Sequence, residues 1–579
     1  MKRRFISLLC AAALLMSGSF SRAEVPDSIP QVRNIILMIP DGCSLASYSV
    51  ARWYQRYLNE DQKYLNIDPY LCGTVLTYCS DSPVGDSAPT TSCYMTGYPS
   101  QAGYVSTYPV SAGDQDVIPM DPQRAYTPVA TLLEMGKIKL GKRTGLVVTC
   151  EFPHATPADC SSHSASRKRY DIIVPQMLHQ NMNVVMGGGS SLMPKAEKAR
   201  LEVKGYDVVL DDLQALRKSK KSNLWALFGK QSLPNDMDRD TTKIPSISEM
   251  TKIAIDKLDD KNSTGFFLMV EGSKVDWAAH ANDPVGIVSE LLAFDKACKV
   301  ALDFAKKDGH TAVVILSDHG NSGISLAKED GYNHPQNMNK KQFFEGFVRH
   351  KKTAEGLSTA INKTPYAQLD SLMMDLSGIK LTSQERDALL NTEDYVFSPI
   401  TKDQRKLIDG NPFASKTVYD YCCKLLTKHS PVGFTTHGHT GEDVILFAYH
   451  PENAVPRGMT INVDLADYLA RLWGKRAPYD SLTDEIFSPQ NEVFKGMKII
   501  EVPAKKDYKK LAKYDFVKEN LQQYAPTLVI KNGKKTMTVE AYVDYVTING
   551  KKKQIPSVTI YEPNTKKFYL PKSLRALML

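Results

Sequence analysis

Short apolar runs, rich in β-branched residues, recur along the chain, and each has the length of a single buried strand. They occupy residues 34–39, 145–149, 183–186, 265–270, 311–316 and, much later, 443–448. Segments with helical character, such as residues 284–306, lie between them. Continuous apolar strands that alternate with helices are typical of a parallel sheet covered on both faces. We therefore predict an α/β fold with a mostly parallel central sheet and helices on both faces.

The overall composition agrees with a folded globular protein. Of the 579 residues, 42% are hydrophobic and 23% are charged. These values exclude a mainly disordered, collagen-like or coiled-coil chain. No apolar run approaches the length of about 20 residues that a bilayer crossing needs, so we also exclude a polytopic membrane protein.

The first 23 residues have the pattern of a secretory signal peptide. Basic residues at positions 2–4 precede an apolar stretch at residues 5–16, and small residues follow at Ser21 and Ala23. We place the mature N-terminus at Glu24. The protein is accordingly predicted to be periplasmic, secreted or held at the cell surface, and not transmembrane.

Two later regions depart from the alternating pattern. Residues 321–430 are rich in polar side chains and contain amphipathic stretches, so we predict a mostly helical insertion that serves as a cap or an interface. Residues 490–579 contain β-rich runs at 527–530, 537–546 and 557–561 with Asn-Gly pairs at 532–533 and 549–550, which favour tight hairpins. We predict a small β-rich C-terminal module there. The remaining residues, 24–320 and 431–489, form the predicted main domain.

The C-terminal module is basic. Residues 491–579 hold 18 Lys and Arg against 8 Asp and Glu, a net charge of +10. Such a charge would allow contact with anionic envelope material, although a solvated β module has the same composition. The lysines form short runs, and we find no nucleic-acid motif.

The cysteines give one further expectation. Cys72 and Cys79, and Cys150 and Cys160, are close enough in sequence to form disulfides, but a sequence cannot assign the pairing.

Polar side chains follow four of the predicted strands near the point where each strand ends. In chain order they are Asp41, His154, Thr156, Glu271, Asp318 and His319. In open α/β sheets the ligand crevice lies outside the carboxyl ends of the strands. One such residue alone is more often a helix cap or a solvated turn. Four strands that deliver carboxylates, imidazoles and a hydroxyl to one edge predict a single polar site.

Asp276 and His280 add a candidate metal site. They are four residues apart, so on a helix they share a face, although a surface helix gives the same spacing by chance. His439 stands just before the apolar run at 443–448 and offers another imidazole. This mixture of oxygen and nitrogen ligands suits zinc. The candidates that offer oxygen alone, and so suit magnesium, are Asp41, Thr156 and Glu271.

Ser87 is the candidate nucleophile. Asp86 or Ser87 can cap a helix whose first turn contains Pro89. Ser87 would then lie near a helix N-terminus, where backbone N–H groups favour an anion. An ordinary serine-capped helix has the same pattern. No base is evident beside Ser87, but a metal ion could lower the pKa of its hydroxyl. Arg167 could clamp a phosphate, although its basic neighbours are equally typical of a solvated face.

Together these residues closely resemble the alkaline phosphatases. The matching segments, in the order found in that family, are Asp41-Gly42, Asp86-Ser87-Ala88, His154-Ala155-Thr156-Pro157, Ser166-Arg167-Lys168, Gly187-Gly188-Gly189, Glu271 through His280, Asp318-His319 and His439 through Asp443. Each motif alone is weak, but so many in one order make the resemblance specific. It covers about residues 32–321 and 436–474.

The resemblance implies a hydrolase of phosphate monoesters that forms a phosphoserine intermediate on Ser87 and releases inorganic phosphate. It implies that Arg167 grips two phosphoryl oxygens and that each chain holds two Zn²⁺ ions and one Mg²⁺ ion. The implied zinc ligands are Asp276, His280 and His439 for one ion, and Asp41, Asp318 and His319, with Ser87 beside them, for the other. The implied magnesium ligands are Asp41, Thr156 and Glu271, and we add His154 as a candidate metal ligand. The family is usually dimeric, so a homodimer is one expectation, while the long insertion leaves a monomer open.

Three positions depart from the pattern of many family members. His154 stands where some members have Asp, Trp277 stands where some have Lys, and Asn321 stands where a His is frequent. These changes affect the surroundings of the expected ligands. We expect them to alter metal affinity and rate and to leave the reaction class unchanged.

Two alternatives remain at this point. The first is a phosphodiesterase or sulfatase on the same scaffold. Arg167 argues against a diesterase, because a second ester group would occupy the place of an oxygen that Arg167 grips. A sulfatase would usually carry an Arg two residues after the motif's Pro, and Ser87-Ala88-Pro89-Thr90-Thr91 lacks it. The second is an envelope-binding protein without turnover, which the basic module motivates and the complete ligand set opposes.

Overall fold

The computed structural model describes residues 28–110, 118–260, 264–328, 339–398, 414–511 and 514–579. The predicted signal peptide, residues 1–23, lies outside these ranges. Among the described residues, no helix has both the length and the apolar character that a membrane crossing requires.

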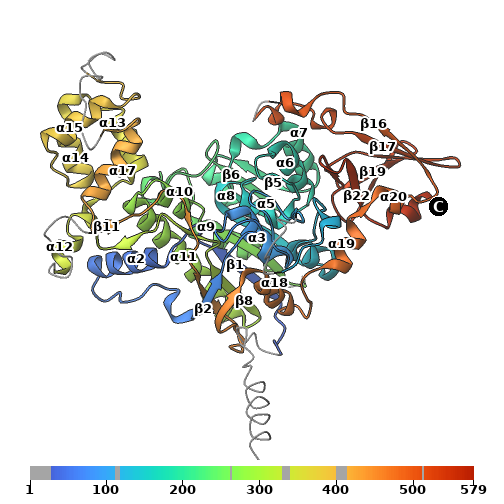
Figure 1. The fold of residues 1–579 in the computed structure, drawn as a ribbon, viewed down its shortest axis with the longest axis horizontal. Helices are drawn as coiled ribbons and strands as arrows, with labels where there is room; N and C mark the ends of the chain where they lie inside the picture. The colour runs from blue at the N-terminus through green and yellow to red at the C-terminus, as the bar shows by residue number, and fades with distance from the viewer. Residues whose placement is uncertain (1–27, 111–117, 261–263, 329–338, 399–413, 512–513) are drawn as a thin grey trace, which may run out of the picture.

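The centre of the molecule is a sheet of ten strands with helices on both sides (Figure 1). Nine strands point the same way, and β13 alone runs antiparallel to the strands beside it. This arrangement confirms the predicted α/β class. Across the sheet, the strands are β14 (Gly458–Ile461), β2 (Leu71–Leu76), β13 (Val444–Tyr449), β8 (Thr311–Leu316), β1 (Asn34–Ile39), β7 (Phe266–Glu271), β3 (Arg143–Glu151), β4 (Val184–Gly188), β6 (Leu224–Phe228) and β5 (Asp207–Leu210).

Both faces of the sheet are buried, which explains why its strands are apolar throughout. Successive side chains of a strand point to opposite faces. Ile36 and Met38 of β1 therefore pack in one apolar core, while Leu37 and Ile39 pack in the other. The first core is covered by α2 (Leu45–Leu58), α8 (Leu213–Lys218), α9 (Ile247–Leu258), α10 (Lys274–His280) and α11 (Pro284–Asp308). The second is covered by α3 (Ser87–Thr96), α5 (Ala155–Ser161), α6 (Tyr170–His179), α7 (Lys195–Val203) and α18 (Asn462–Arg471).

The predicted strands agree with the observed ones to within a few residues. The runs at 34–39 and 311–316 coincide with β1 and β8, and the predicted helix at 284–306 is α11. Sequence analysis missed β2, β5, β6 and β14. β5 and β14 form the two edges of the sheet and have four residues each. In β2 only Val75 is fully buried, so these three strands lack the burial on both faces that produces a continuous apolar run. β6, in contrast, is apolar and buried throughout, and it was missed despite this pattern.

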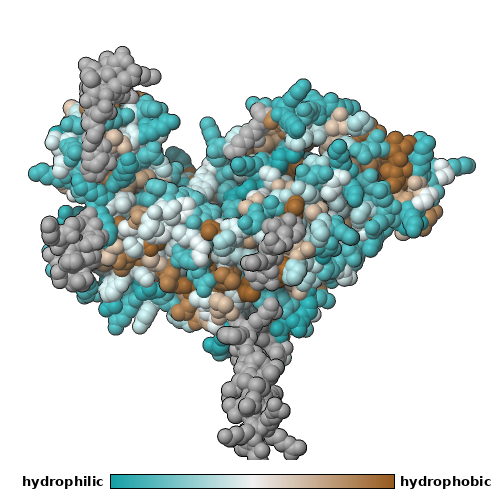
Figure 2. Space-filling model, viewed as in Figure 1, coloured by the Kyte–Doolittle hydropathy of each residue, from teal (hydrophilic) through white to brown (hydrophobic). Residues whose placement is uncertain are grey.

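The segment predicted as a helical insertion is indeed helical where it is described. Its helices are α12 (Lys340–Phe344), α13 (Ala354–Ile361), α14 (Leu369–Ser377), α15 (Ser383–Ala388) and α17 (Val418–Lys428). Helices α13, α14, α15 and α17 form a lobe at the upper left of Figure 1, and Figure 2 shows a hollow between this lobe and the main body. The backbone N–H of Ala354, at the start of α13, donates to Asp283 at 2.8 Å, which ties the lobe to the N-terminus of α11.

The C-terminal region contains two small antiparallel sheets, at the right of Figure 1. Figure 2 shows an apolar patch over the larger of them. The strands of the larger sheet are β16 (Lys498–Val502), β17 (Thr527–Asn532), β18 (Lys535–Val539), β19 (Tyr545–Ile548) and β20 (Lys551–Gln554). The strands of the smaller sheet are β15 (Ser488–Pro489), β22 (Lys567–Leu570) and β21 (Ile560–Glu562).

Both predicted hairpins are present in the larger sheet. Asn532 pairs with Lys535 across the first turn, and Asn549-Gly550 forms the second. Asn549 and Gly550 have φ values of +46° and +80°, as a two-residue hairpin turn requires. One prediction was wrong: the β-rich run at 537–546 is not continuous. Tyr542 has φ +63°, which is incompatible with extended backbone, so β18 and β19 are separate strands.

This C-terminal region packs tightly against the main body. Four of its apolar side chains belong to the second core of the central sheet: Phe516, Val558, Ile560 and Tyr569. Asp544 is 2% exposed and lies against α6. Its carboxylate is 2.5 Å from His179 Nδ1 and accepts hydrogen bonds from Asn181 at 2.8 Å and Lys204 at 2.7 Å. The charged contacts therefore reinforce the apolar ones across this interface.

Cys72, Cys79, Cys150 and Cys160 are all free thiols in the structure. The two disulfides that sequence proximity allowed are therefore not formed.

Candidate active site

Four adjacent parallel strands, in the order β8, β1, β7 and β3, bring the predicted polar side chains to one edge of the sheet. Asp41 follows β1, Glu271 is the last residue of β7, and Asp318 and His319 follow β8. Thr156 lies in the first turn of α5, which follows β3. The side chains thus collect outside the carboxyl ends of the strands, where open α/β sheets bind ligands.

The first group of candidate ligands contains Asp276, His280 and His439, whose ligand atoms all lie within 4.8 Å of one another. Asp276 and His280 share one face of α10, and His280 Nε2 is 3.4 Å from Asp276 Oδ2. His439 Nε2 is 3.0 Å from His280 Nε2. Backbone carbonyls orient both rings: His280 Nδ1 lies 2.6 Å from the oxygen of His437, and His439 Nδ1 lies 2.9 Å from that of Gly85. The free Nε2 atoms therefore face the Asp276 carboxylate.

His319 is the centre of the second group. Its Nε2 lies 3.4 Å from Asp41 Oδ1 and 3.5 Å from Asp318 Oδ2. The same nitrogen is 3.4 Å from Ser87 Oγ. The rings of His319 and His439 stack with centroids 3.7 Å apart, which places the two groups side by side. Ser87 therefore stands next to the carboxylates and imidazoles of this second group.

A third group lies at the end of β3 and contains Cys150, His154 and Glu271. The thiol of Cys150 is 3.5 Å from Glu271 Oε2. Thr156 is fully buried close by in the chain, and in the described part of the protein its hydroxyl has no hydrogen-bond partner. The ligands expected for magnesium are therefore accompanied by a thiol and an imidazole.

The buried negative charge of these groups favours a bound cation. Asp41, Glu271 and Asp318 are fully buried, and Asp276 is 5% exposed. Burial, and then the neighbouring charge of Asp318, raise the pKa of both Asp41 and Glu271. Among the described residues no hydrogen-bond donor serves either oxygen of Asp41, Oε1 of Glu271 or Oδ2 of Asp318. Buried charges are normally paired or bound to metals, so this donor set fits metal ions.

The helix that carries Ser87 begins at the site. Ser87 is the first residue of α3, and Asp86 is its N-cap, but no side chain caps the helix. The Asp86 carboxylate is instead 2.5 Å from Nη1 of Arg167. Burial acts to raise the pKa of Asp86, but the charges of Arg167, His319 and His439 and the hydrogen bond from Arg167 together outweigh it, so this pKa lies below its usual value. The free N–H groups of the first turn of α3 therefore remain beside Ser87 Oγ.

Arg167 is held by two contacts next to Ser87. Besides its contact with Asp86, its Nη2 lies 3.2 Å from Nε2 of His154. Burial and the charge of Arg167 lower the pKa of His154. A neutral His154 can accept the hydrogen bond from Arg167. The ring of Trp277 meets that of His154 edge-on at 5.8 Å, so two of the positions that depart from the family pattern are in contact.

Gly42 allows the first and second groups of candidate ligands to approach each other. Its φ is +63°, and a Cβ on Gly42 would lie 2.4 Å from Asp276 Oδ1. Any other residue would displace the Asp276 carboxylate, so the Asp41-Gly42 pair is a requirement of the site as well as of the turn.

Three residues of the site had no predicted role in it. Cys150 was considered only for a disulfide, Asp86 only as a helix cap, and Asn321 only as a departure from the family pattern. Asn321 Nδ2 donates to Asp276 Oδ1 at 2.6 Å. Asp86 precedes the nucleophile directly, and that adjacency was the available signal. Asn321 was marked by its departure from the family pattern, which was expected to affect the surroundings of the ligands. No sequence signal marked Cys150, because its contact with Glu271 comes from a distant strand.

Comparisons with known proteins agree with the fold and show the family. The family profile described as "Alkaline phosphatase" matches residues 32–474. Alkaline phosphatase 3 of Bacillus subtilis is 33% identical over 492 residues, which cover 80% of this chain and 96% of that protein. The crystal structure of a cold-active alkaline phosphatase from a Shewanella species has a TM-score of 0.62 and 27% identity, covering 76% of this chain and 100% of that chain. The Thermus thermophilus alkaline phosphatase, at 21% identity and a TM-score of 0.65, covers 80% of this chain and 95% of its own and shares the fold.

The fold and its buried carboxylate and imidazole groups define a metal-dependent hydrolase. The chain belongs to the alkaline phosphatase family, and its reaction class is the hydrolysis of phosphoric monoesters.

Proposed function

We propose that the protein hydrolyses phosphate monoesters through a phosphoserine intermediate on Ser87. The observation that carries this proposal is the position of Ser87 Oγ, 3.4 Å from His319 Nε2 and at the first turn of a ten-residue buried helix. The N–H groups of that turn favour an anion at this point. A phosphoryl group attached to Ser87 would thus be stabilised by the helix on one side and faced by Arg167 on the other.

We propose that each chain holds two Zn²⁺ ions and one Mg²⁺ ion. One zinc would be held by Asp276, His280 and His439, and the other by Asp41, Asp318 and His319. Magnesium would be held by Asp41, Thr156 and Glu271, with His154 as a further candidate ligand. The unpaired buried oxygens support these assignments. When bound, the zinc ions would supply Lewis acidity that favours the ionised Ser87 hydroxyl and offsets charge on the leaving oxygen.

Arg167 is proposed to orient the phosphoryl group. Asp86 holds its Nη1 beside Ser87, and the remaining N–H groups can reach two phosphoryl oxygens in the planar geometry that a guanidinium prefers. His154 accepts from Nη2 and limits the rotation of the guanidinium. In a diester, one of the oxygens that Arg167 would bind carries the second ester group. This arrangement supports a monoesterase over a diesterase.

We also propose a division of the chain. Residues 24–320 and 431–489 would be the catalytic domain, because they contain all ten strands of the central sheet. Residues 321–430 would be an insertion that forms a cap or an interface, and residues 490–579 a basic C-terminal module. Export after removal of residues 1–23, to the periplasm or the cell surface, follows from the sequence pattern of that segment. A homodimer is proposed on the family resemblance alone, and light scattering of the purified protein tests it.

Turnover by the mature protein, residues 24–579, tests the main proposal. The enzyme is loaded with zinc and magnesium and supplied with p-nitrophenyl phosphate or with bis(p-nitrophenyl) phosphate. We expect fast cleavage of the monoester, slow cleavage of the diester, and loss of both in Ser87→Ala. Preferred cleavage of the diester would mean that Arg167 has another role. No turnover of either ester, with the metals bound, would favour a binding protein without catalysis.

A further inference from the structure

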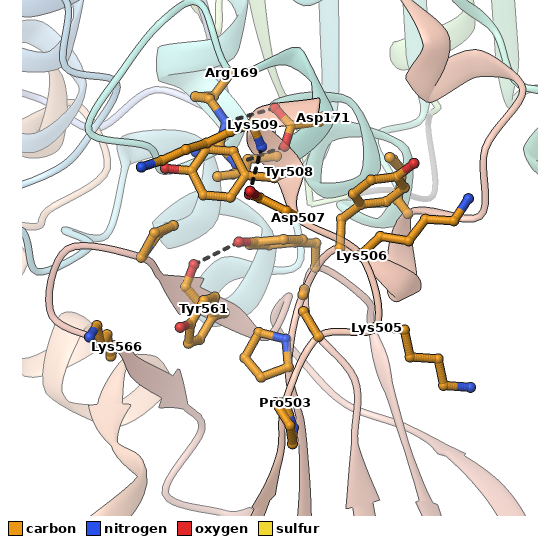
Figure 3. A pocket seen from close by; sticks show the side chains of 18 of the residues that line it. Arg169, Asp171, Pro503, Lys505, Lys506, Asp507, Tyr508, Lys509, Tyr561 and Lys566 are labelled. Atoms are coloured by element: carbon orange, nitrogen blue, oxygen red, sulfur yellow. Dashed lines mark hydrogen bonds and ion pairs between the residues drawn. The ribbon is translucent and has the colours of Figure 1, made fainter. Parts of the chain in front are cut away.

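A cavity of about 570 Å³ lies where the C-terminal sheets meet the main body (Figure 3). Arg169 and Asp171, at the start of α6, form its wall on the side of the main body. The other walls come from three separate parts of the C-terminal region, within residues 501–509, 521–542 and 561–566. The cavity therefore exists only because this region is folded against α6. Its volume lies in the range typical of sites for small ligands.

Tyrosine rings provide most of the aromatic surface of this cavity. They are Tyr508, Tyr524, Tyr542 and Tyr561. Tyr542 is 5% exposed, and its hydroxyl donates to the backbone oxygen of Tyr561 at 2.8 Å. The guanidinium of Arg169 lies 4.0 Å from the centroid of the Tyr508 ring and restrains it. Restrained tyrosines offer flat apolar area and hydroxyl groups at a small entropic cost.

Three lysines around the tyrosines are available to a ligand. Arg169 is occupied by Asp171, with contacts of 2.8 and 2.7 Å. Among the described residues, no ion pair or side-chain hydrogen bond involves the ammonium groups of Lys505, Lys509 or Lys566. Figure 3 shows Lys505 and Lys566 on opposite sides of the cavity. Five basic side chains line the cavity against three acidic ones.

We propose that this cavity binds an anionic saccharide. The C–H faces of the sugar rings would cover the tyrosines, and the acidic groups of the saccharide would pair with Lys505, Lys509 and Lys566. The inference gives the basic C-terminal region a defined site for anionic material. It does not depend on the proposed phosphatase chemistry, because none of the residues assigned to that chemistry lines the cavity.

The distribution of charge favours a saccharide over a nucleic acid. Proteins that bind single strands present a continuous positive groove, because every nucleotide carries a phosphate. Here the carboxylates of Glu501 and Asp507 line the same cavity as the lysines. A cavity lined by both positive and negative side chains suits a ligand with widely spaced acidic groups and many hydroxyl groups. Hydroxyl groups of a sugar can donate to the carboxylates, which phosphates cannot do.

Isothermal titration calorimetry of the metal-loaded mature protein tests the proposal. The probe is α-1,4-linked hexagalacturonate in 0.15 M NaCl, with maltohexaose as the neutral match and an eight-nucleotide oligothymidylate as the nucleic acid. We expect binding of hexagalacturonate alone. The double variant Lys505→Ala, Lys509→Ala should weaken it tenfold or more, because it removes two of the three cationic groups that would pair with the acidic groups of the saccharide. Tyr508→Ala should also weaken it.

The matched control removes the same charge elsewhere in the C-terminal region. Lys551 and Lys553 are exposed on β20 and do not line the cavity, so Lys551→Ala, Lys553→Ala should change the affinity less than twofold. Equal weakening by both double variants would show a diffuse charge effect and overturn the site. Equal binding of maltohexaose, tighter binding of the oligothymidylate, or no binding of hexagalacturonate would also overturn it. All variants should cleave p-nitrophenyl phosphate like the parent protein, which separates this test from the catalytic proposal.

Discussion

Replacement of Arg167 by alanine tests how the site selects its substrate. Its Nη1 is 2.5 Å from Asp86 Oδ1 and its Nη2 is 3.2 Å from His154 Nε2, so the guanidinium stands beside Ser87 with further N–H groups free to bind oxygen. Hydrogen bonds that involve a charged group contribute about 1.5–3 kcal/mol each. Two of them amount to about 3–6 kcal/mol, which corresponds to a fall of about 10²–10⁴ in kcat/KM for a monoester.

A diester should suffer less from the same replacement. Its second ester group takes the place of one oxygen that Arg167 would bind, so only one hydrogen bond is lost, and kcat/KM should fall by about 10–10². The preference for monoester over diester should therefore drop by about one to two orders of magnitude. Steady-state kinetics with p-nitrophenyl phosphate and bis(p-nitrophenyl) phosphate measure both quantities.

Lys168→Ala is the matched control for this experiment. Lys168 is the exposed neighbour of Arg167 and carries the same charge. Its removal should leave both kcat/KM values nearly unchanged. Equal losses on the two esters in Arg167→Ala, or a similar loss in Lys168→Ala, would refute a direct grip on two phosphoryl oxygens. The effect would then reflect long-range charge alone.

Three further predictions concern the supports of the site and of the fold. Asn321→Ala removes the 2.6 Å hydrogen bond to Asp276 and should weaken zinc binding by about 10–100-fold in a chelator competition; unchanged affinity would contradict this role. Asp544→Ala should lower the free energy of unfolding in urea by about 3–5 kcal/mol, because buried His179 loses the nearer of its two acidic partners and Lys204 loses its acceptor, and a loss below about 1 kcal/mol would argue against it. Burial alone would raise the pKa of Glu197, but the hydrogen bonds and charges of His179 and Arg200 together outweigh it and lower the pKa to about 2 from 4.5. The stabilisation that ionised Glu197 gives to the fold is therefore present above pH 4.5 and is lost as the pH falls through 2. Glu197→Gln should lower the urea midpoint more at pH 7 than at pH 3, and equal losses at the two pH values would contradict the assignment.

The strands at the centre of the sheet could be predicted from the sequence because local composition determines them. A strand covered on both faces is apolar at every position, so β1 and β8 coincide with predicted runs. β5 and β14 lie at the edges of the sheet, and their pairing depends on neighbours that are remote in the chain. The division of the run at 537–546 likewise follows from the backbone at Tyr542.

The chemistry of the site was visible in the sequence because each functional group follows a strand or shares a helix turn. Asp276 and His280 lie on one face of α10 as their spacing required. The same reasoning placed Asp41, Glu271 and Asp318 at one edge, since the carboxyl ends of neighbouring parallel strands must meet there. Local order along the chain was sufficient for these residues.

Tertiary structure alone decided which groups touch. Asp86 pairs with Arg167 instead of capping its helix, because the start of α3 meets the segment between α5 and α6. Asn321 supports Asp276, because β9 (Gly320–Asn321) meets α10. The sequence indicated a basic β-rich C-terminal module, but not that Phe516 would enter the core of the central sheet. It also could not reveal a tyrosine-lined cavity against α6. A sequence determines the pattern of apolar residues along each helix and strand and the order of the chemical groups along the chain. Contacts between remote segments depend on how the layers of helices and strands pack.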